Sequence, residues 1–197
     1  MLLTVRKVYI RSQVHLEHDT RLAVDEAVWL VNSDDPRTGE DVLADSATLF
    51  EYLDGRRVSG SRTGSATELR SIHLLRSRLR EVFELAIAER LDATVDAINA
   101  LIAHCGPMPR LVRHDGLPLH LHYTPPDAPL DQRLGAEMAI ALAIVIRDGG
   151  IERLRACPAP GCGRVFVDLT KNQSRRYCDA QCANRVHAAA YRQRREV

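Results

Sequence analysis

Four of the five cysteines in this 197-residue chain lie in the last 41 residues, and their spacing restricts how that part can fold. Cys157, Cys162, Cys178 and Cys182 form the pattern C-x4-C, fifteen residues, then C-x3-C. Two close pairs at this separation can converge on one ion, and four thiolates suit a tetrahedral zinc site. Zinc fits better than an iron–sulfur cluster, although four thiolates can hold either. Four unrelated thiols, or a regulatory disulfide in place of zinc, are the alternatives.

The predicted zinc ion has a structural role, because thiolates fill all four positions and leave none open for water. The segment 151–197 has few large apolar side chains, and a module this small needs a bound metal ion or a similar cross-link to fold stably. Neighbouring arginines would offset the charge of the thiolates and favour their deprotonation. They are Arg155, Arg164, Arg175, Arg176 and Arg185.

Charge is distributed unevenly along the chain, although the net charge is only +1. Residues 151–197 hold ten basic and four acidic side chains, whereas residues 1–150 hold 17 basic and 22 acidic ones. A basic segment attached to an acidic one is typical of a protein with a polyanion-binding end, for which nucleic acid is the usual candidate. The change in charge coincides with Gly149 and Gly150. We therefore predict two domains, 1–150 and 151–197.

The N-terminal domain is predicted to be mainly helical, because its apolar residues recur at helical spacing. The expected helices cover 19–31, 46–54, 65–86, 92–106 and 130–148. Ser46 is the expected cap of the second helix, and Ser65 with Glu68 forms a capping-box pattern for the third. The segment 130–148 is apolar on most faces, which predicts the central helix of the core.

A small β-hairpin interrupts the helical pattern. Asp115-Gly116 separates two apolar-alternating runs, 111–114 and 117–123, which favours a tight turn between two strands. Pro118 makes the second strand an edge strand or shortens it. Residues 32–39 are predicted to be a loop, and a short strand is expected within 1–12. The fold class is therefore mainly α with a small β-hairpin, followed by a four-cysteine zinc-binding module.

A basic helix is predicted from Asp179 onward, with Cys182 in its first turn. Arg185, Arg192 and Arg195 follow at i, i+7 and i+10, which places them on one helical face. An arginine stripe on a slim helix can enter a major groove or lie along phosphates. The loop between the cysteine pairs adds further cations. The predicted nucleic-acid contacts are Lys171, Arg175, Arg176, Arg185, Arg192 and Arg195.

A structural interpretation of the same residues stays open. The arginines could neutralise the thiolates and contact the acidic N-terminal domain without binding nucleic acid. For Asn184 and Arg185 this interpretation is favoured: Asn184 would bond the backbone near the metal, and Arg185 would pair with an acid such as Asp168.

The run from Cys157 to Arg194 resembles the CGNR zinc finger. Its Arg-Arg-aromatic-Cys is followed after three residues by Cys182-Ala183-Asn184-Arg185, which corresponds to the Cys-Gly-Asn-Arg signature. The run LAVDEAVWLVNSDDPRTGEDVLADSATLFEYLDG is similar to the start of the ABATE domain, which normally precedes this finger. The resemblance implies a stress-induced transcriptional regulator with Cys157, Cys162, Cys178 and Cys182 as the zinc ligands. Ala183 departs from the family's glycine, and we expect it to be helical.

These observations favour a regulator that binds DNA through the zinc module, while the helical domain senses a signal or forms a homodimer. The alternative is an adaptor in which the zinc module binds a protein partner. An enzyme is not expected, because the chain has no Gly-rich phosphate loop, nucleophile elbow or HExxH motif. No secretory signal or apolar run long enough to cross a bilayer is seen, so we expect a cytoplasmic protein.

Overall fold

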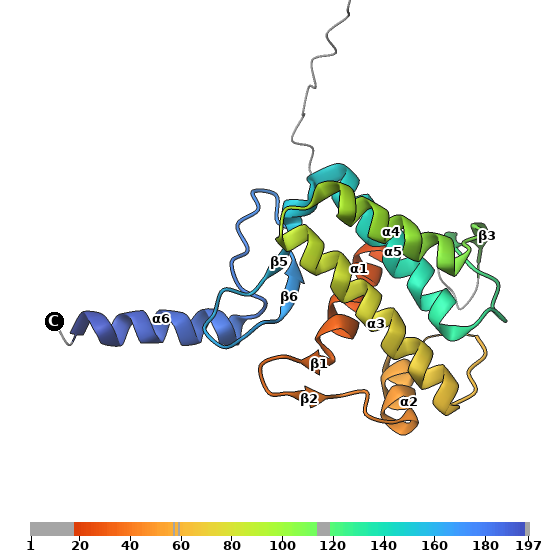
Figure 1. The fold of residues 1–197 in the computed structure, drawn as a ribbon, viewed down its shortest axis with the longest axis horizontal. Coiled ribbons are helices and arrows are strands. Elements are labelled where there is room, and N and C mark those ends of the chain that lie inside the picture. The colour runs from red at the N-terminus through yellow and green to blue at the C-terminus, as the bar shows by residue number, and fades with distance from the viewer. Residues whose placement is uncertain (1–17, 57, 59, 114–118, 196–197) are drawn as a thin grey trace, which may run out of the picture.

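The computed structural model describes residues 18–56, 58, 60–113 and 119–195. Within these residues, five helices form a helical body, and a C-terminal segment with two strands and one helix follows it (Figure 1). The helices are α1 (His18–Asn32), α2 (Ser46–Gly55), α3 (Ala66–Ile87), α4 (Leu91–Cys105), α5 (Leu130–Gly149) and α6 (Ala180–Arg195). The strands are β1 (Asp34–Asp35), β2 (Glu40–Asp41), β3 (Arg110–Val112), β4 (His120–His122), β5 (Leu154–Ala156) and β6 (Val165–Val167). A 3-10 turn, η1 (Ile151–Arg153), joins α5 to β5.

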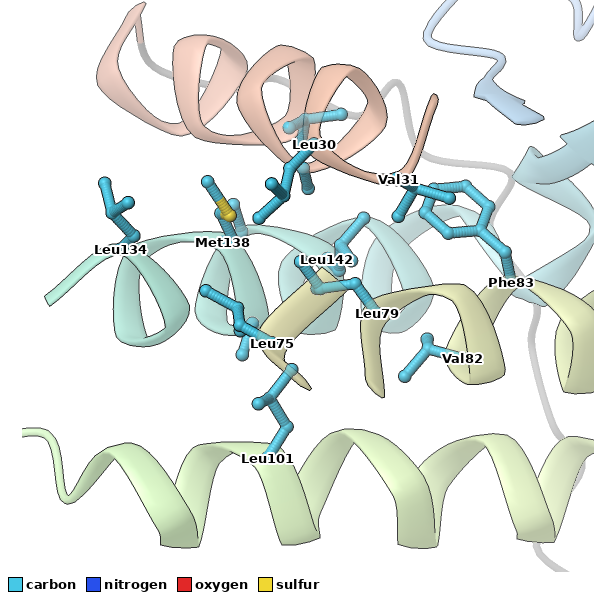
Figure 2. Close-up of a cluster of buried hydrophobic side chains, with 14 of the residues drawn as sticks. Leu30, Val31, Leu75, Leu79, Val82, Phe83, Leu101, Leu134, Met138 and Leu142 are labelled. Carbon is cyan, nitrogen blue, oxygen red and sulfur yellow. The ribbon is translucent and has the colours of Figure 1, made fainter. Parts of the chain in front are cut away.

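Helix α5 is the centre of the core, as its sequence predicts. It packs against α1, α3 and α4, and Figure 2 shows the α5 side chains Leu134, Met138 and Leu142 between those helices. Small residues such as Ala136 and Ala139 are fully buried on α5 and let the neighbouring helices approach closely. An apolar helix covered on several sides in this way is stabilised by packing more than by its own propensity.

The predicted helix starts are confirmed at α3 and wrong at α2. The Ser65 hydroxyl accepts a hydrogen bond from the backbone N–H of Glu68, which is the predicted cap. The second half of the predicted capping box differs, because the Glu68 carboxylate accepts from the backbone N–H groups of Thr63 and Gly64 and not from that of Ser65. At α2 the cap is Asp45 instead of Ser46, and it shares a capping box with Thr48. Asp45 and Ser46 both have a short polar side chain. Asp45 precedes the helix and has the extended backbone that directs its carboxylate to the backbone N–H of Thr48, whereas Ser46 is already the first helical residue.

Two short hairpins extend from the helical body. Strands β3 and β4 pair antiparallel, with Leu111 opposite Leu121, which confirms the two predicted strands. The predicted turn at Asp115-Gly116, Pro118, and the strand expected within 1–12 lie outside the described residues. The loop predicted over 32–39 contains a second ladder, because β1 pairs with β2 across residues 36–39.

Strands β5 and β6 form an antiparallel ribbon that packs on α1 and α3. The ribbon's side chains Leu154, Val165 and Val167 are buried in the same core as the helices. The division at residue 150 remains a prediction, but the two predicted domains are not separated by a solvent layer. Beyond the ribbon, α6 extends away from the helical body (Figure 1), and Cys182 is its one buried residue.

Within the described part of the chain, no helix combines the length and the apolar character that a membrane-spanning segment requires.

Candidate metal centre and basic helix

The four clustered cysteines come together at one point, between the β5–β6 ribbon and the start of α6. Their sulfur atoms all lie within 4.8 Å of one another, and each cysteine is free. The Sγ atoms of Cys162, Cys178 and Cys182 form a triangle with sides of 3.6 to 3.7 Å. We call residues 151–195, which contain this cluster, the cysteine module.

These separations fit a zinc ion. A tetrahedron with zinc–sulfur bonds of about 2.3 Å has sulfur–sulfur edges of about 3.8 Å, close to the sides of the triangle. The cluster is a satellite of the main core, since Cys157, Cys162 and Cys182 are buried with Ala159 and Phe166. Four thiols that are positioned for one ion give the cysteine module one structural zinc.

The first cysteine pair lies in the turn that connects β5 to β6. Cys157 follows β5 directly, and its backbone N–H donates to the carbonyl of Arg164, which closes the ribbon. Cys162 lies between Gly161 and Gly163, whose φ angles are 69° and 68°. This left-handed backbone favours glycine, because a Cβ would clash with the carbonyl oxygen. The glycines allow the chain to reverse within a few residues and return both sulfurs to one side.

The second pair lies at the start of α6. Asp179 precedes the helix, and its carboxylate accepts a hydrogen bond of 2.7 Å from the backbone N–H of Cys182. This hydrogen bond lowers the pKa of Asp179. It also fixes Cys182 one helical turn above Cys178, so both sulfurs point to the same ion. Ala183 is within α6, as expected, and its φ is not positive, so this chain does not need the family's glycine there.

The four thiols are too close to lose their protons independently. Burial opposes ionisation of Cys157, but hydrogen bonds from the backbone N–H groups of Cys178 and Ala159 and from the thiols of Cys178 and Cys162 together lower its pKa. Burial and the neighbouring sulfurs raise the pKa of Cys178, and burial with the neighbouring Cys162 raises that of Cys182 to about 11. A divalent cation allows all four thiols to lose their protons, because its charge stabilises the four thiolates together.

Asp168, directly after β6, organises the loop between the two cysteine pairs. Its side chain is completely buried and accepts hydrogen bonds from the backbone N–H groups of Thr170 (2.9 Å) and Arg175 (3.0 Å). The Arg155 guanidinium lies 3.4 Å from the same carboxylate. Asp168 is therefore occupied within the loop, and the expected ion pair between Arg185 and Asp168 is wrong.

Arg185 instead stabilises the cysteine cluster. Its Nη2 atom lies 3.5 Å from the sulfur of Cys182 and 3.5 Å from the carbonyl oxygen of Pro160. A guanidinium in this position offsets thiolate charge and links the start of α6 to the first cysteine turn. Asn184 is exposed, and the backbone hydrogen bond expected of it is not found among the described residues.

Arg175 is also bound within the cysteine module. It donates hydrogen bonds to the carbonyls of Tyr177 and Cys178, and its guanidinium lies 5.1 Å from the centre of the Phe166 ring. The remaining four predicted contacts have exposed side chains that form no ion pair with any residue in the described ranges. They are Lys171, Arg176, Arg192 and Arg195.

The cysteine module is fixed to the helical body by polar contacts from the end of α1. The side-chain amide of Asn32 forms two hydrogen bonds with the backbone of Val165. Its Nδ2 donates to the Val165 carbonyl and its Oδ1 accepts from the Val165 N–H, both at 2.9 Å. Asp35 is buried and binds Arg164 at 2.6 Å, which lowers the pKa of Asp35. The second Arg164 nitrogen lies 3.8 Å from Asp179, the cap of α6.

Two arginines of α3 bind the β1–β2 hairpin and the end of α1, which carry these contacts. Arg76 binds Asp41 through two nitrogens, at 2.7 and 2.8 Å, and lowers the pKa of that carboxyl. Arg80 donates to the backbone carbonyls of Val31 and Asp34. A continuous set of contacts therefore runs from α3 through the β1–β2 hairpin to the first turn of α6.

Sequence reasoning did not find Asn32 and Asp35 as partners of the cysteine module. They lie in a segment whose Asn, Asp, Pro and Gly content indicates only a loop, and Val165 is 133 residues further along the chain. A pattern of neighbouring residues cannot predict a contact between residues so far apart in the sequence.

Two family models match the chain in the same order as these two regions. The ABATE model, described as "Putative stress-induced transcription regulator", matches residues 25–149. The CGNR zinc finger model matches residues 153–195, which include all four cysteines. A comparison with curated proteins gives no match. The ABATE model covers more than half of the chain, and the cysteine geometry is that of a zinc site. This chain therefore belongs to the ABATE family and carries a C-terminal CGNR zinc finger.

Proposed function

We propose that this protein regulates transcription by binding DNA with α6 and the loop that precedes it. The observation that carries the proposal is the position of α6. It begins on the zinc cluster, extends into solvent away from the helical body, and contains no acidic residue over Ala180–Arg195. A helix about 10–12 Å wide fits the major groove of B-DNA.

The exposed cations support the same conclusion. Arg192 and Arg195 lie on one face of α6, and Lys171 and Arg176 lie in the loop between the cysteine pairs. None of the four forms an ion pair with a described residue, and the guanidinium of Arg195 lies 5.8 Å from the centre of the exposed Tyr191 ring. Cations of this kind bind phosphates and release counterions, which makes the affinity for DNA depend steeply on salt.

The zinc ion and the contacts to the helical body would fix the direction of α6. Asp179 caps the helix, and Arg164 connects that region to Asp35 on the helical body. A groove-binding helix that is held at its base loses less conformational freedom on binding than a free peptide would. The helical body would supply sensing or dimerisation in this proposal.

The experiment is a fluorescence anisotropy titration of a labelled 30-base-pair duplex with the zinc-loaded protein, over a series of salt concentrations. The logarithm of the affinity should fall linearly with the logarithm of the salt concentration, with a slope of about −0.9 per phosphate contacted. Replacing both Arg192 and Arg195 by Ala should reduce that slope by about 1.8. Arg113→Ala, an exposed arginine of the helical body, is the control for a change in total charge.

The absence of binding at low salt, with one zinc per chain confirmed, would overturn the proposal. Capture of a specific protein partner by the same sample, without nucleic acid, would favour the adaptor alternative.

The proposal gives the zinc no catalytic task, because four thiolates fill its coordination sphere. It also places the protein in the cytoplasm, where thiols stay reduced and available to a metal.

A further inference from the structure

A hollow of about 250 Å³ lies at the base of the zinc finger, beside the first cysteine turn. It is lined by Arg155, Ala156, Pro158, Phe166 and Arg176. These residues come from both strands of the ribbon, from the first cysteine turn and from the loop before the second cysteine pair. The hollow is therefore an open depression formed by the same segments that gather the zinc ligands.

Arg176 gives the hollow a positive charge, and Arg155 adds guanidinium donors, although the buried Asp168 offsets its charge. Arg155 is held in place, because its guanidinium donates to the carbonyl of Arg175 at 2.9 Å and lies 3.4 Å from the buried Asp168. Its other N–H groups remain for a ligand, since a guanidinium carries five donors. Arg176 is exposed and forms no ion pair with a residue in the described ranges.

The rest of the lining selects the kind of ligand. Ala156, Pro158 and Phe166 have no side-chain donor or acceptor, so they cannot read the edge of a base. A guanidinium fork matches the oxygens of a phosphate. The Phe166 ring is itself covered, being 1% exposed, and Arg175 lies over it, so no base can stack there.

We propose that this hollow binds one phosphate of the DNA backbone between Arg155 and Arg176. The inference rests on the proposed DNA-binding function and deepens it, because it adds Arg155 and assigns one phosphate to a defined place between Arg155 and Arg176. Phosphate contacts fix the register and orientation of a protein on a duplex without reading its sequence. Here the contact would fix the base of α6 while the exposed arginines further along enter the groove.

The test uses the full chain and the same anisotropy assay, with Arg176→Ala as the main variant. Loss of one charge-assisted phosphate contact should weaken binding roughly tenfold, to a similar degree for unrelated duplex sequences. The salt slope should fall by about 0.9. Arg176→Lys keeps the charge but not the fork, so it should keep the slope and lose part of the affinity.

Two controls separate this contact from a general charge effect and from misfolding. Arg113→Ala removes one charge on the helical body and should leave the slope unchanged. The zinc content and thermal midpoint of Arg176→Ala should equal those of the wild type, because that side chain is exposed.

The outcomes distinguish the two proposals. If the wild type binds and Arg176→Ala behaves like Arg113→Ala, the hollow is not a phosphate site, and the proposed function stands on the contacts of Lys171, Arg192 and Arg195 alone. If the zinc-loaded wild type shows no binding at low salt, the proposed function fails and this inference fails with it.

Discussion

Removing the zinc ion should destabilise the helical body as well as the finger. The reason is that the two parts share one core. Leu154, Val165 and Val167 belong to the ribbon that carries the first cysteine pair, and they are buried among the helices with 2 to 3% exposure. If the ribbon separates when the four thiols lose their ion, these three side chains return to water.

The magnitude follows from that burial. A fully buried aliphatic side chain contributes about 1.5–3 kcal/mol, so three contribute at most about 5–9 kcal/mol. This is comparable with the whole stability of an ordinary domain, which is about 5–15 kcal/mol. Allowing for a ribbon that separates only in part, we expect a loss of at least about 3 kcal/mol. With a urea m-value of about 2 kcal/mol/M, the midpoint should fall by at least about 1.5 M.

Trp29 provides the assay. It is the one tryptophan of the chain and lies on α1, where its ring stacks on Tyr52 with centroids 3.6 Å apart. Its fluorescence therefore reports on the helical body and not on the finger. Urea titrations would compare the zinc-loaded protein, the same protein after chelation, and the Cys182→Ser variant. Cys105→Ala is the matched control, because Cys105 is buried on α4, outside the cluster, and should leave the zinc content unchanged.

An unchanged urea midpoint at Trp29 after chelation has removed the zinc would refute a shared core. That result would mean that the ribbon stays packed on the helices without its metal, and that the finger and the body are energetically independent.

Further predictions concern the contacts between the helical body and the cysteine module, and one half-buried acid, Glu137. Asn32→Ala should lower stability by about 2–3 kcal/mol, measured by urea denaturation, because two hydrogen bonds to the buried Val165 are lost. Asp35→Asn should cost about 2 kcal/mol, and a double-mutant cycle with Arg164→Met should give a coupling above about 1 kcal/mol; additive effects would contradict the pair. Burial raises the pKa of Glu137 from 4.5 to about 6, so its charged form destabilises the fold. Glu137→Gln should therefore gain up to about 2 kcal/mol over the wild type at pH 8. The gain should shrink toward pH 5, and a constant gain would contradict the assignment.

Local chemistry made several features predictable from the sequence. The cysteine spacing predicts the metal site because each pair lies within one turn, and Ser65 predicts the start of α3 because its partner is three residues away. The central position of α5 follows from its apolar faces, which have to be covered by other helices. The distribution of charge predicts a basic C-terminal segment, but it does not separate the arginines that hold the finger together from those that face solvent.

The sequence by itself determined which helices form and which residues gather around the ion, because those choices depend on neighbours a few positions away, but it did not reveal the β1–β2 ladder. Only the tertiary structure decided that Arg175 and Arg185 serve the finger internally, that Arg155 and Arg176 border a hollow, and that Asn32 and Asp35 anchor the finger to the helices. The anchoring contacts of Asn32 and Asp35 span 133 and 129 residues, whereas the arginines find partners 2 to 25 residues away whose positions depend on how the loops of the cysteine module fold. The final position of each guanidinium follows from which carbonyl, carboxylate or sulfur that packing places within its reach.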